Sequence, residues 1–98
     1  MNIIKTLDGA SLLIKLEGRL DTPAAPELDQ VLKASLSGVS DLCFDFSQLD
    51  YLSSAGLRVL ISAQKTMNRQ GRMKLIHVND MLMEIFEVTG FSQFLTIE

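Results

Sequence analysis

Residues 42–58 read LCFDFSQLDYLSSAGLR, and the character of the sequence changes within this stretch. Residues 42–46 are an apolar, aromatic run that is typical of a central β-strand. After Ser54 the apolar residues recur at helical spacing, at Leu57, Leu60, Ile61 and Met67. The small residues at positions 53–56 mark the junction between the two patterns. The stretch therefore predicts a buried strand that leads directly into a helix.

The sequence before this stretch predicts two strands and a helix. Residues 3–7 and 12–16 are β-prone, and Asp8-Gly9 between them supplies the positive φ of a hairpin turn. Asp21-Thr22-Pro23 then offers a cap and a proline at a helix start. The apolar residues of that helix recur at Leu28, Val31, Leu32 and Leu36, and Gly38 ends the pattern.

The sequence after this stretch predicts a strand, a helix and a last short strand. Gly71 ends the second helix, and residues 73–78 alternate in the way that strands do. Asn79-Asp80 can cap a third helix that carries Leu82, Ile85 and Phe86 and closes at Gly90. Residues 94–97 then predict the last strand.

The predicted order of elements is β-β-α-β-α-β-α-β within a single domain of residues 1–98. Strands separated by helix-length connections require a partly parallel sheet. The fold class is therefore α/β, with a mixed sheet and helices packed mainly on one face.

Composition excludes several classes of protein. The net charge of −3 and the pI of about 5.0 argue against a nucleic-acid partner, because affinity for nucleic acid rests on clustered Lys and Arg. The single cysteine, Cys43, rules out an internal disulfide. There is no apolar run of the ~18 residues needed to span a membrane and no signal peptide, so we expect a cytoplasmic protein without membrane insertion.

The sequence contains few of the motifs that catalysis requires. Ser54-Ala55-Gly56 is half of a nucleophile elbow, but Leu52 stands where the elbow needs a glycine. The chain has one histidine, His77, and one cysteine, too few for a structural zinc site. Neither phosphate-loop nor dinucleotide-binding glycine motifs occur. We expect no catalytic residues, no metal and no cofactor.

The paired serines are the unusual feature of the junction. A serine before a helix commonly serves as its N-cap, but one cap suffices and two serines are present. Helix N-termini favour phosphate, because they carry exposed N–H groups and the positive end of the helix dipole. Ser54 is therefore a candidate for phosphorylation.

Residues 45–58 resemble the signature of the anti-sigma factor antagonist branch of the STAS family (sulphate transporter and anti-sigma factor antagonist). Two further stretches match, GRLDT at Gly18 to Thr22 and TGF at Thr89 to Phe91, so that the resemblance spans essentially the whole chain. It implies a STAS-like fold and a bacterial switch protein that regulates transcription and is not an enzyme.

The resemblance also implies partners and a site. In this family the unmodified antagonist binds an anti-sigma factor, often itself a serine kinase, and phosphorylation at the start of the second helix releases it. A serine phosphatase resets the switch. On this sequence the phosphorylated serine falls on Ser54, and the implied partner-binding residues are Asp21, Thr22, Ser53, Ser54, Ala55, Gly56, Leu57 and Arg58.

The sequence departs from the family pattern at one position. Many members carry Asp-Ser where this chain has Ser53-Ser54, so Ser53 is a second candidate for the phosphorylated residue. Asp21 can supply the missing negative charge or serve only as a helix cap.

Two other functions stay open. One is a non-phosphorylated STAS subunit of a lipid-transport ABC complex, in which the serine is a contact or a cap. The other is a small esterase that uses Ser54.

Overall fold

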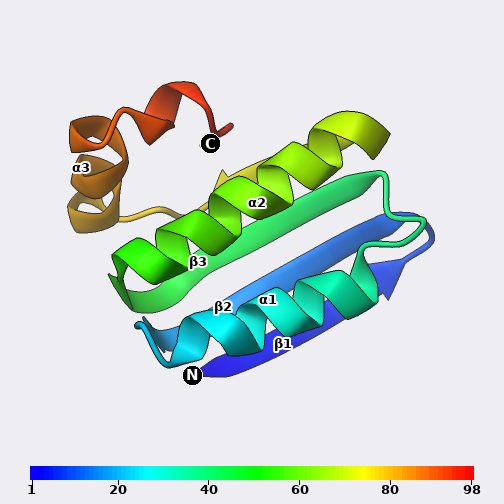
Figure 1. The fold of residues 1–98 in the computed structure, drawn as a ribbon, viewed down its shortest axis with the longest axis horizontal. Helices are drawn as coiled ribbons and strands as arrows, with labels where there is room; N and C mark the ends of the chain where they lie inside the picture. The colour runs from blue at the N-terminus through cyan, green and yellow to red at the C-terminus, as the bar shows by residue number, and fades with distance from the viewer.

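The computed structural model describes residues 1–98, which form a sheet, three α-helices and a short 3₁₀ helix (Figure 1). The elements in chain order are β1 (Asn2–Asp8), β2 (Ser11–Leu20), α1 (Ala24–Ser35), β3 (Asp41–Leu52), α2 (Ser54–Gln70), β4 (Arg72–Ile76), α3 (Asp80–Val88) and η1 (Phe91–Gln93). The predicted order of strands and helices is confirmed up to α3.

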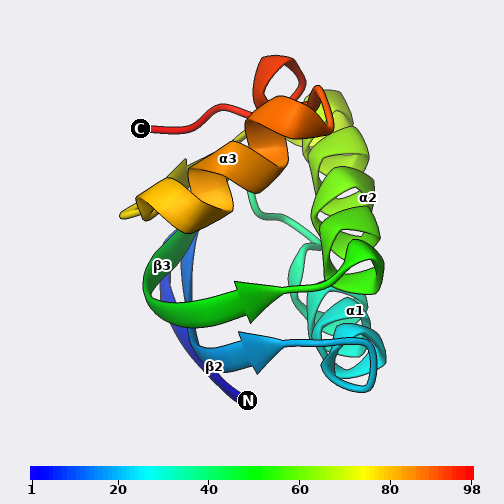
Figure 2. The ribbon, with the colours of Figure 1, turned by 90° about the vertical axis from the view of Figure 1, so that its left-hand side faces the viewer.

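The sheet is mixed, in the order β1-β2-β3-β4. Strand β1 pairs antiparallel with β2, and β2, β3 and β4 are parallel to one another. The turn between β1 and β2 places Gly9 at φ +62°, as the Asp-Gly pair predicted. Helices α1 and α2 lie side by side on one face of the sheet, and α3 lies near its β4 edge (Figure 2). The predicted fold class, with helices mainly on one face, is confirmed.

The core lies between the sheet and the helices. Alternate residues of β2 and β3 point into it, and Ile14, Leu16 and Phe44 are fully buried there. The helices contribute Leu28, Leu32, Leu60, Met67, Leu82 and Phe86 to the same cluster of 23 residues. Because this cluster anchors both α1 and α2, the strand-to-helix junctions rest on a packed support.

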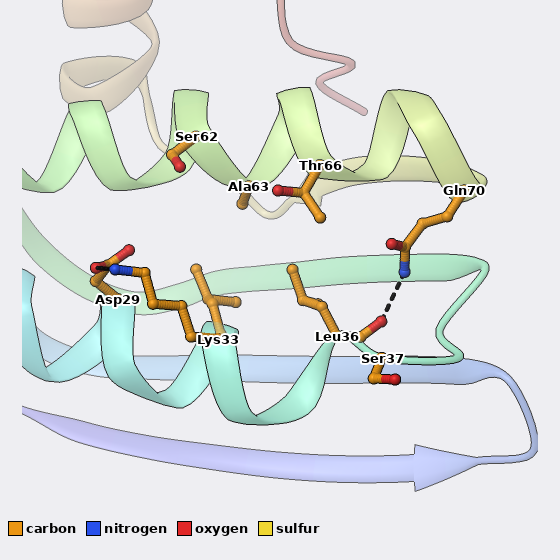
Figure 3. Close-up of a pocket in the computed structure, with 9 residues that line it drawn as sticks. Asp29, Lys33, Leu36, Ser37, Ser62, Ala63, Thr66 and Gln70 are labelled. Atoms are coloured by element: carbon orange, nitrogen blue, oxygen red, sulfur yellow. Dashed lines mark hydrogen bonds and ion pairs between the residues drawn. The ribbon is translucent and has the colours of Figure 1, made fainter.

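Helices α1 and α2 are tied together at their C-terminal ends. A groove of about 250 Å³ runs between the two helices, with Leu32, Leu36 and Ala63 among its lining residues (Figure 3). At its end, the side-chain amide of Gln70 donates hydrogen bonds to the carbonyl oxygens of Leu36 and Val39, both at 2.6 Å. This link fixes the relative position of the two helices at the end opposite Ser54.

The predicted last strand, residues 94–97, is wrong in extent. Gly90, at φ +80°, starts η1 instead, and the N–H of Phe94 donates to the carbonyl of Phe91. Only Ile97 reaches the sheet, where it forms a single parallel bridge with Leu75 beside β4. The N–H of Leu95 also donates to the carbonyl of Phe91, so Phe94 and Leu95 stay in the turn after η1 and do not pair with β4.

Strand β4 is also shorter than residues 73–78. It ends at Ile76 because His77 adopts a left-handed conformation, with φ 58°. Histidine tolerates this region better than most residues do. The backbone thereby turns out of the sheet towards Asn79, whose side chain accepts a hydrogen bond of 2.8 Å from the N–H of Leu82 and caps α3 as predicted.

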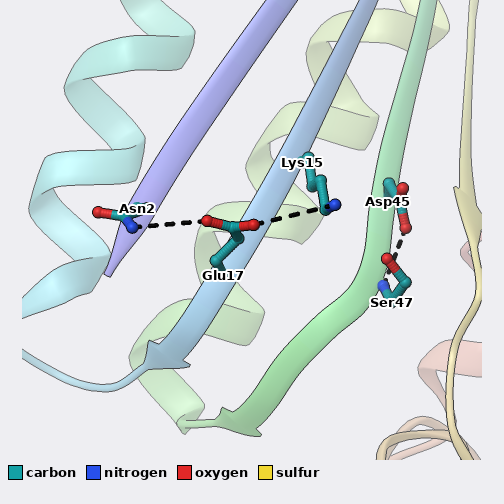
Figure 4. Close-up of polar contacts among 5 residues, drawn as sticks. All are labelled: Asn2, Lys15, Glu17, Asp45 and Ser47. Carbon is teal, nitrogen blue, oxygen red and sulfur yellow. Dashed lines mark hydrogen bonds and ion pairs between the residues drawn. The ribbon is translucent and has the colours of Figure 1, made fainter.

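The face of the sheet opposite the helices carries polar contacts in place of a covering layer (Figure 4). Lys15 forms an ion pair of 3.8 Å with Glu17, which also accepts a hydrogen bond of 3.5 Å from Asn2. The side chain of Asp45 accepts a hydrogen bond of 2.9 Å from the N–H of Ser47. We refer to this surface as the open face.

Two side chains of the open face have displaced pKa values. Partial burial works to raise the pKa of Asp45, but the hydrogen bonds from Ser47 and the nearby charges of His77 and Lys15 outweigh it and hold the pKa below its ordinary value. Burial raises the pKa of the Cys43 thiol above its ordinary value. Neither residue belongs to the junction that carries the paired serines.

None of the helices combines the length and the hydropathy that crossing a bilayer requires.

Candidate functional site

Two strand ends and two helix starts meet at one edge of the molecule. Leu20 and Leu52 are paired in register at the carboxyl ends of the parallel strands β2 and β3. Strand β2 leads through Asp21 into α1, and β3 leads through Ser53 into α2. Figure 2 shows the two strands turning into the two helices side by side. The partner-binding residues predicted from the sequence therefore lie on two adjacent connections.

Ser53 is the N-cap of α2 and is buried, with 8% of its surface exposed. Its hydroxyl oxygen accepts a hydrogen bond of 3.0 Å from the N–H of Gly56. Its own N–H donates to the carbonyl of Leu20 at 2.8 Å. The backbone N–H and the hydroxyl of Ser53 are therefore both hydrogen-bonded. The N–H bond to Leu20 ties the start of α2 to the end of β2.

Ser54 is the first residue of α2 and is exposed. Its hydroxyl takes part in none of the hydrogen bonds of the structure. The N–H groups of Ser54 and Ala55 are likewise unused, as expected at the first turn of a helix. The junction therefore presents a hydroxyl and two backbone donors to solvent.

Gly56 and Leu57 are packing residues. Both are buried, and a Cβ added at Gly56 would lie 2.5 Å from the Leu20 Cγ and 3.0 Å from the Leu20 carbonyl oxygen. Only glycine lets the first turn of α2 approach the end of β2 so closely. Ala55 is half-buried beside them, whereas Arg58 is exposed. The predicted set thus divides into residues that hold the junction together and residues that face outward.

Asp21 and Thr22 stand on the neighbouring connection. One carboxylate oxygen of Asp21 accepts a hydrogen bond of 3.0 Å from the N–H of Ala24, in the first turn of α1. Asp21 is half-buried, and Thr22 is exposed. The N-cap position of α1 is occupied by Pro23, and the Asp21 carboxylate accepts from the first N–H of the helix from two residues before the N-cap.

A cation–π pair, which the sequence pattern does not predict, flanks the junction. The guanidinium of Arg19 lies over the ring of Tyr51, 4.2 Å from its centroid, and Tyr51 is 39% exposed. These two residues are register partners in β2 and β3 only because β3 contains extra residues, so no spacing along the chain predicts their contact.

No titratable side chain is hydrogen-bonded to either of the paired serines. The Ser54 hydroxyl has no hydrogen-bonded base, and His77 is an exposed residue in the turn after β4. No three side chains among His, Cys, Asp and Glu are grouped so that they could hold a metal ion. An exposed hydroxyl at the start of a helix is a group that another protein can modify or contact.

The two serines should respond differently to removal of their hydroxyl groups. Ser53→Ala is expected to lower the free energy of unfolding by about 1 kcal/mol, because the N–H of Gly56 loses its acceptor. Ser54→Ala is expected to change it by less than about 0.5 kcal/mol, since an exposed hydroxyl without a partner is lost. Urea unfolding followed by circular dichroism measures both, and equal losses would contradict the assignment of Ser53 as the cap.

Comparison with known proteins gives a consistent result. A family model described as "Mlab, STAS domain" matches residues 4–97. BtrV of Bordetella bronchiseptica, whose name places it among the anti-sigma factor antagonists, is 34% identical over 87 residues, a match that covers 87% of this chain and 74% of BtrV.

Solved structures agree in fold. An anti-sigma-factor antagonist (STAS) domain protein from Planctomyces limnophilus superposes with a TM-score of 0.87 at 17% identity, over 97% of this chain and 87% of that one. Bacillus SpoIIAA in its phosphorylated form gives a TM-score of 0.78 at 16% identity, over 99% of this chain and 91% of that one. SpoIIAA in its unphosphorylated form gives 0.79 at 17% identity, over 99% and 87%.

Proposed function

The chain belongs to the STAS domain family, and on that premise we propose that it is an anti-sigma factor antagonist whose docking is controlled by phosphorylation of Ser54. In this proposal the unmodified protein binds an anti-sigma factor that is also a serine kinase, in the bacterial cytoplasm. Phosphorylation of Ser54 releases that partner, and a serine phosphatase restores the binding form.

One observation carries the choice of Ser54: the two serines lie in different environments. A kinase must bring its active site to the hydroxyl that it modifies. The Ser53 hydroxyl is buried and accepts a hydrogen bond, so that phosphorylation there would break the cap of α2. The Ser54 hydroxyl is exposed and unused. These placements favour Ser54 over Ser53 as the phosphorylated residue.

The modification itself needs nothing from this chain except the hydroxyl. The kinase would transfer the γ-phosphoryl group of ATP to the Ser54 oxygen, so that one O–P bond forms, the bond between the β- and γ-phosphates breaks, and ADP leaves. The hydroxyl proton passes to a base of the kinase. The product carries a charge of about −1.5 to −2 beside the unused N–H groups of the first turn, where an anion stabilises a helix by about 0.3 to 1 kcal/mol.

The outward-facing residues of the junction define the proposed docking surface. Thr22, on the connection between β2 and α1, and Ser54 and Arg58, at the start of α2, are exposed. Asp21, Ser53, Ala55, Gly56 and Leu57 hold those connections in place, and we propose that they act on docking mainly through this support. The division explains why a phosphate on Ser54 would disturb a bound partner and leave the fold of the chain intact.

The relatives support the same proposal. BtrV and SpoIIAA are both named anti-sigma factor antagonists. SpoIIAA has been solved with and without phosphate, and both forms superpose on this chain almost equally well, with TM-scores of 0.78 and 0.79. A fold of this kind therefore accommodates a phosphorylated state.

The direct test is phosphorylation by the cognate kinase. The purified protein is incubated with the kinase and ATP, and the modified residue is mapped by mass spectrometry. We expect phosphate on Ser54, none in Ser54→Ala, and continued phosphorylation of Ser53→Ala as the matched control. Absence of phosphate from both serines would reject the proposal.

The gene neighbourhood separates the proposal from the lipid-transport alternative. An adjacent gene for a serine kinase or serine phosphatase favours the switch. Adjacent genes for a permease and an ATPase, together with an unmodified Ser54, would favour a subunit of a transport complex.

A further inference from the structure

Ser54 and Arg58 lie four residues apart on α2, and both are exposed. Residues at this spacing are neighbours on a helix surface, with Cβ atoms about 5 to 6 Å apart. The order, with the residue to be charged negatively on the N-terminal side of the cation, is the more favourable one. The geometry therefore places a guanidinium within reach of any group attached to the Ser54 oxygen.

Arg58 has no partner in the unmodified protein. The ion pairs of the structure are Lys15–Glu17, Lys33–Asp29, Arg72–Asp41 and Lys74–Glu98. Arg58 belongs to none of them, and the first turn of α2 contains no acidic residue. An unpaired arginine beside a serine that is modified by phosphate is available for a charge-assisted hydrogen bond.

Other cations are engaged or distant. Arg19, at the end of β2, stacks on the ring of Tyr51. Lys65 and Arg69 are on α2, but at a rise of 1.5 Å per residue they lie roughly 16 and 22 Å along the helix from Ser54. Arg58 is the basic residue of this helix that a phosphate on Ser54 can reach.

We propose that the phosphate on Ser54 forms an ion pair with the guanidinium of Arg58 within the same helix. This inference rests on the proposed function, in which Ser54 is the phosphorylated residue. Phosphorylation then has two effects on the docking surface: it adds an anion, and it withdraws the exposed cation from any acidic group of the partner. The net charge of the patch becomes negative with or without the ion pair, and what the pair adds is the loss of a free guanidinium.

The test installs phosphoserine at position 54 during protein synthesis, so that no kinase is needed. The second pKa of the phosphate is then measured by ³¹P NMR titration at low salt. A nearby guanidinium favours the dianion, so Arg58→Gln is expected to raise this pKa by about 0.2 to 0.4. Arg69→Gln is the matched control and is expected to shift it less than Arg58→Gln does, because Arg69 lies roughly 22 Å along the helix from Ser54. Arg19→Gln tests the competing cation and is expected to shift it less than Arg58→Gln does, because Arg19 stacks on Tyr51.

An unchanged phosphate pKa in Arg58→Gln, with circular dichroism showing an intact fold, would overturn the ion pair. A larger shift in Arg19→Gln would assign the phosphate to Arg19 instead and would equally overturn it. Because the phosphate is installed without a kinase, these outcomes leave the proposed function standing. A failure of the kinase to modify Ser54 would, in turn, leave the measured pairing unaffected.

Discussion

Phosphoserine at position 54 is expected to weaken binding of the anti-sigma factor kinase by about a hundredfold to a few thousandfold. Docking would cover the charge, and a charge buried without its partner costs about 3 to 5 kcal/mol. Breaking the exposed ion pair with Arg58 on docking adds about 0.2 to 0.5 kcal/mol to this cost, the value of exposed pairs at this spacing. Isothermal titration of the kinase with the phosphorylated and unmodified proteins measures the ratio.

Two aspartate substitutions test the same loss of affinity for the kinase without phosphoserine. Ser54→Asp carries less charge than phosphoserine and is expected to weaken binding at least tenfold. Ser37→Asp places the same charge on another exposed serine, beyond the far end of α1, and is expected to leave the affinity within about twofold. The free energy of unfolding should change by no more than about 1 kcal/mol in either protein. Equal affinity of the kinase for the phosphorylated and unmodified forms would refute the switch.

Gly71→Ala is expected to lower the free energy of unfolding by about 3 kcal/mol, the largest stability effect that we predict. A Cβ at this position would lie 1.9 Å from the carbonyl oxygen of Ser40 and 2.6 Å from its carbonyl carbon. Ser40 cannot retreat easily, because its N–H donates to Ala10 and its carbonyl accepts from Arg72, at 2.9 and 3.0 Å. The methyl group would therefore press the link between α2 and β4 away from the start of β3.

Gly9→Ala is the matched control for this prediction. Gly9 has φ +62° and no atom within 4 Å of an added Cβ, so its substitution measures backbone strain alone, about 1 kcal/mol. Gly71 has an extended φ of 170°, so its substitution measures the collision alone. Urea unfolding of both variants gives the comparison, and a loss in Gly71→Ala no greater than that in Gly9→Ala would contradict the steric argument.

The sequence predicted the order of elements well where burial imposes a regular period. Strand β2 alternates cleanly, and its buried residues Leu12, Ile14 and Leu16 are those that the alternation indicated. Helix α2 ends at Gly71, as predicted. In these segments one face contacts the core throughout, so the pattern of apolar residues reports the structure directly.

The second half of β3 was not predicted, because the alternation of buried and exposed residues is interrupted there. The strand was expected over residues 42–46, but it runs from Asp41 to Leu52. Its register against β2 shifts between Lys15 and Glu17 and again between Gly18 and Arg19, so β3 gains a residue at each point. The bulges place Leu49 and Leu52 in the core at a spacing of three, which no strand alternation contains.

The junction between β3 and α2 was predicted in position, whereas the environments of its two serines were not. The sequence indicated one cap and one spare hydroxyl at the junction, but it could not tell which serine had which environment. That distinction depends on the end of β3, where the second bulge brings Leu52 opposite Leu20. The N–H of Ser53 then donates to the carbonyl of Leu20, and the side chain of Ser54 is exposed. Local sequence specifies the small residues, whereas strand register specifies their exposure.

The half-buried thiol of Cys43 makes this protein convenient for fluorescence work. A thiol with a raised pKa is mostly protonated at neutral pH and reacts slowly with maleimides. A Ser37→Cys variant would carry a fully accessible second thiol, at the opposite end of the helices from Ser54. A dye would attach there first, and partner release could be followed in real time without removing the native cysteine.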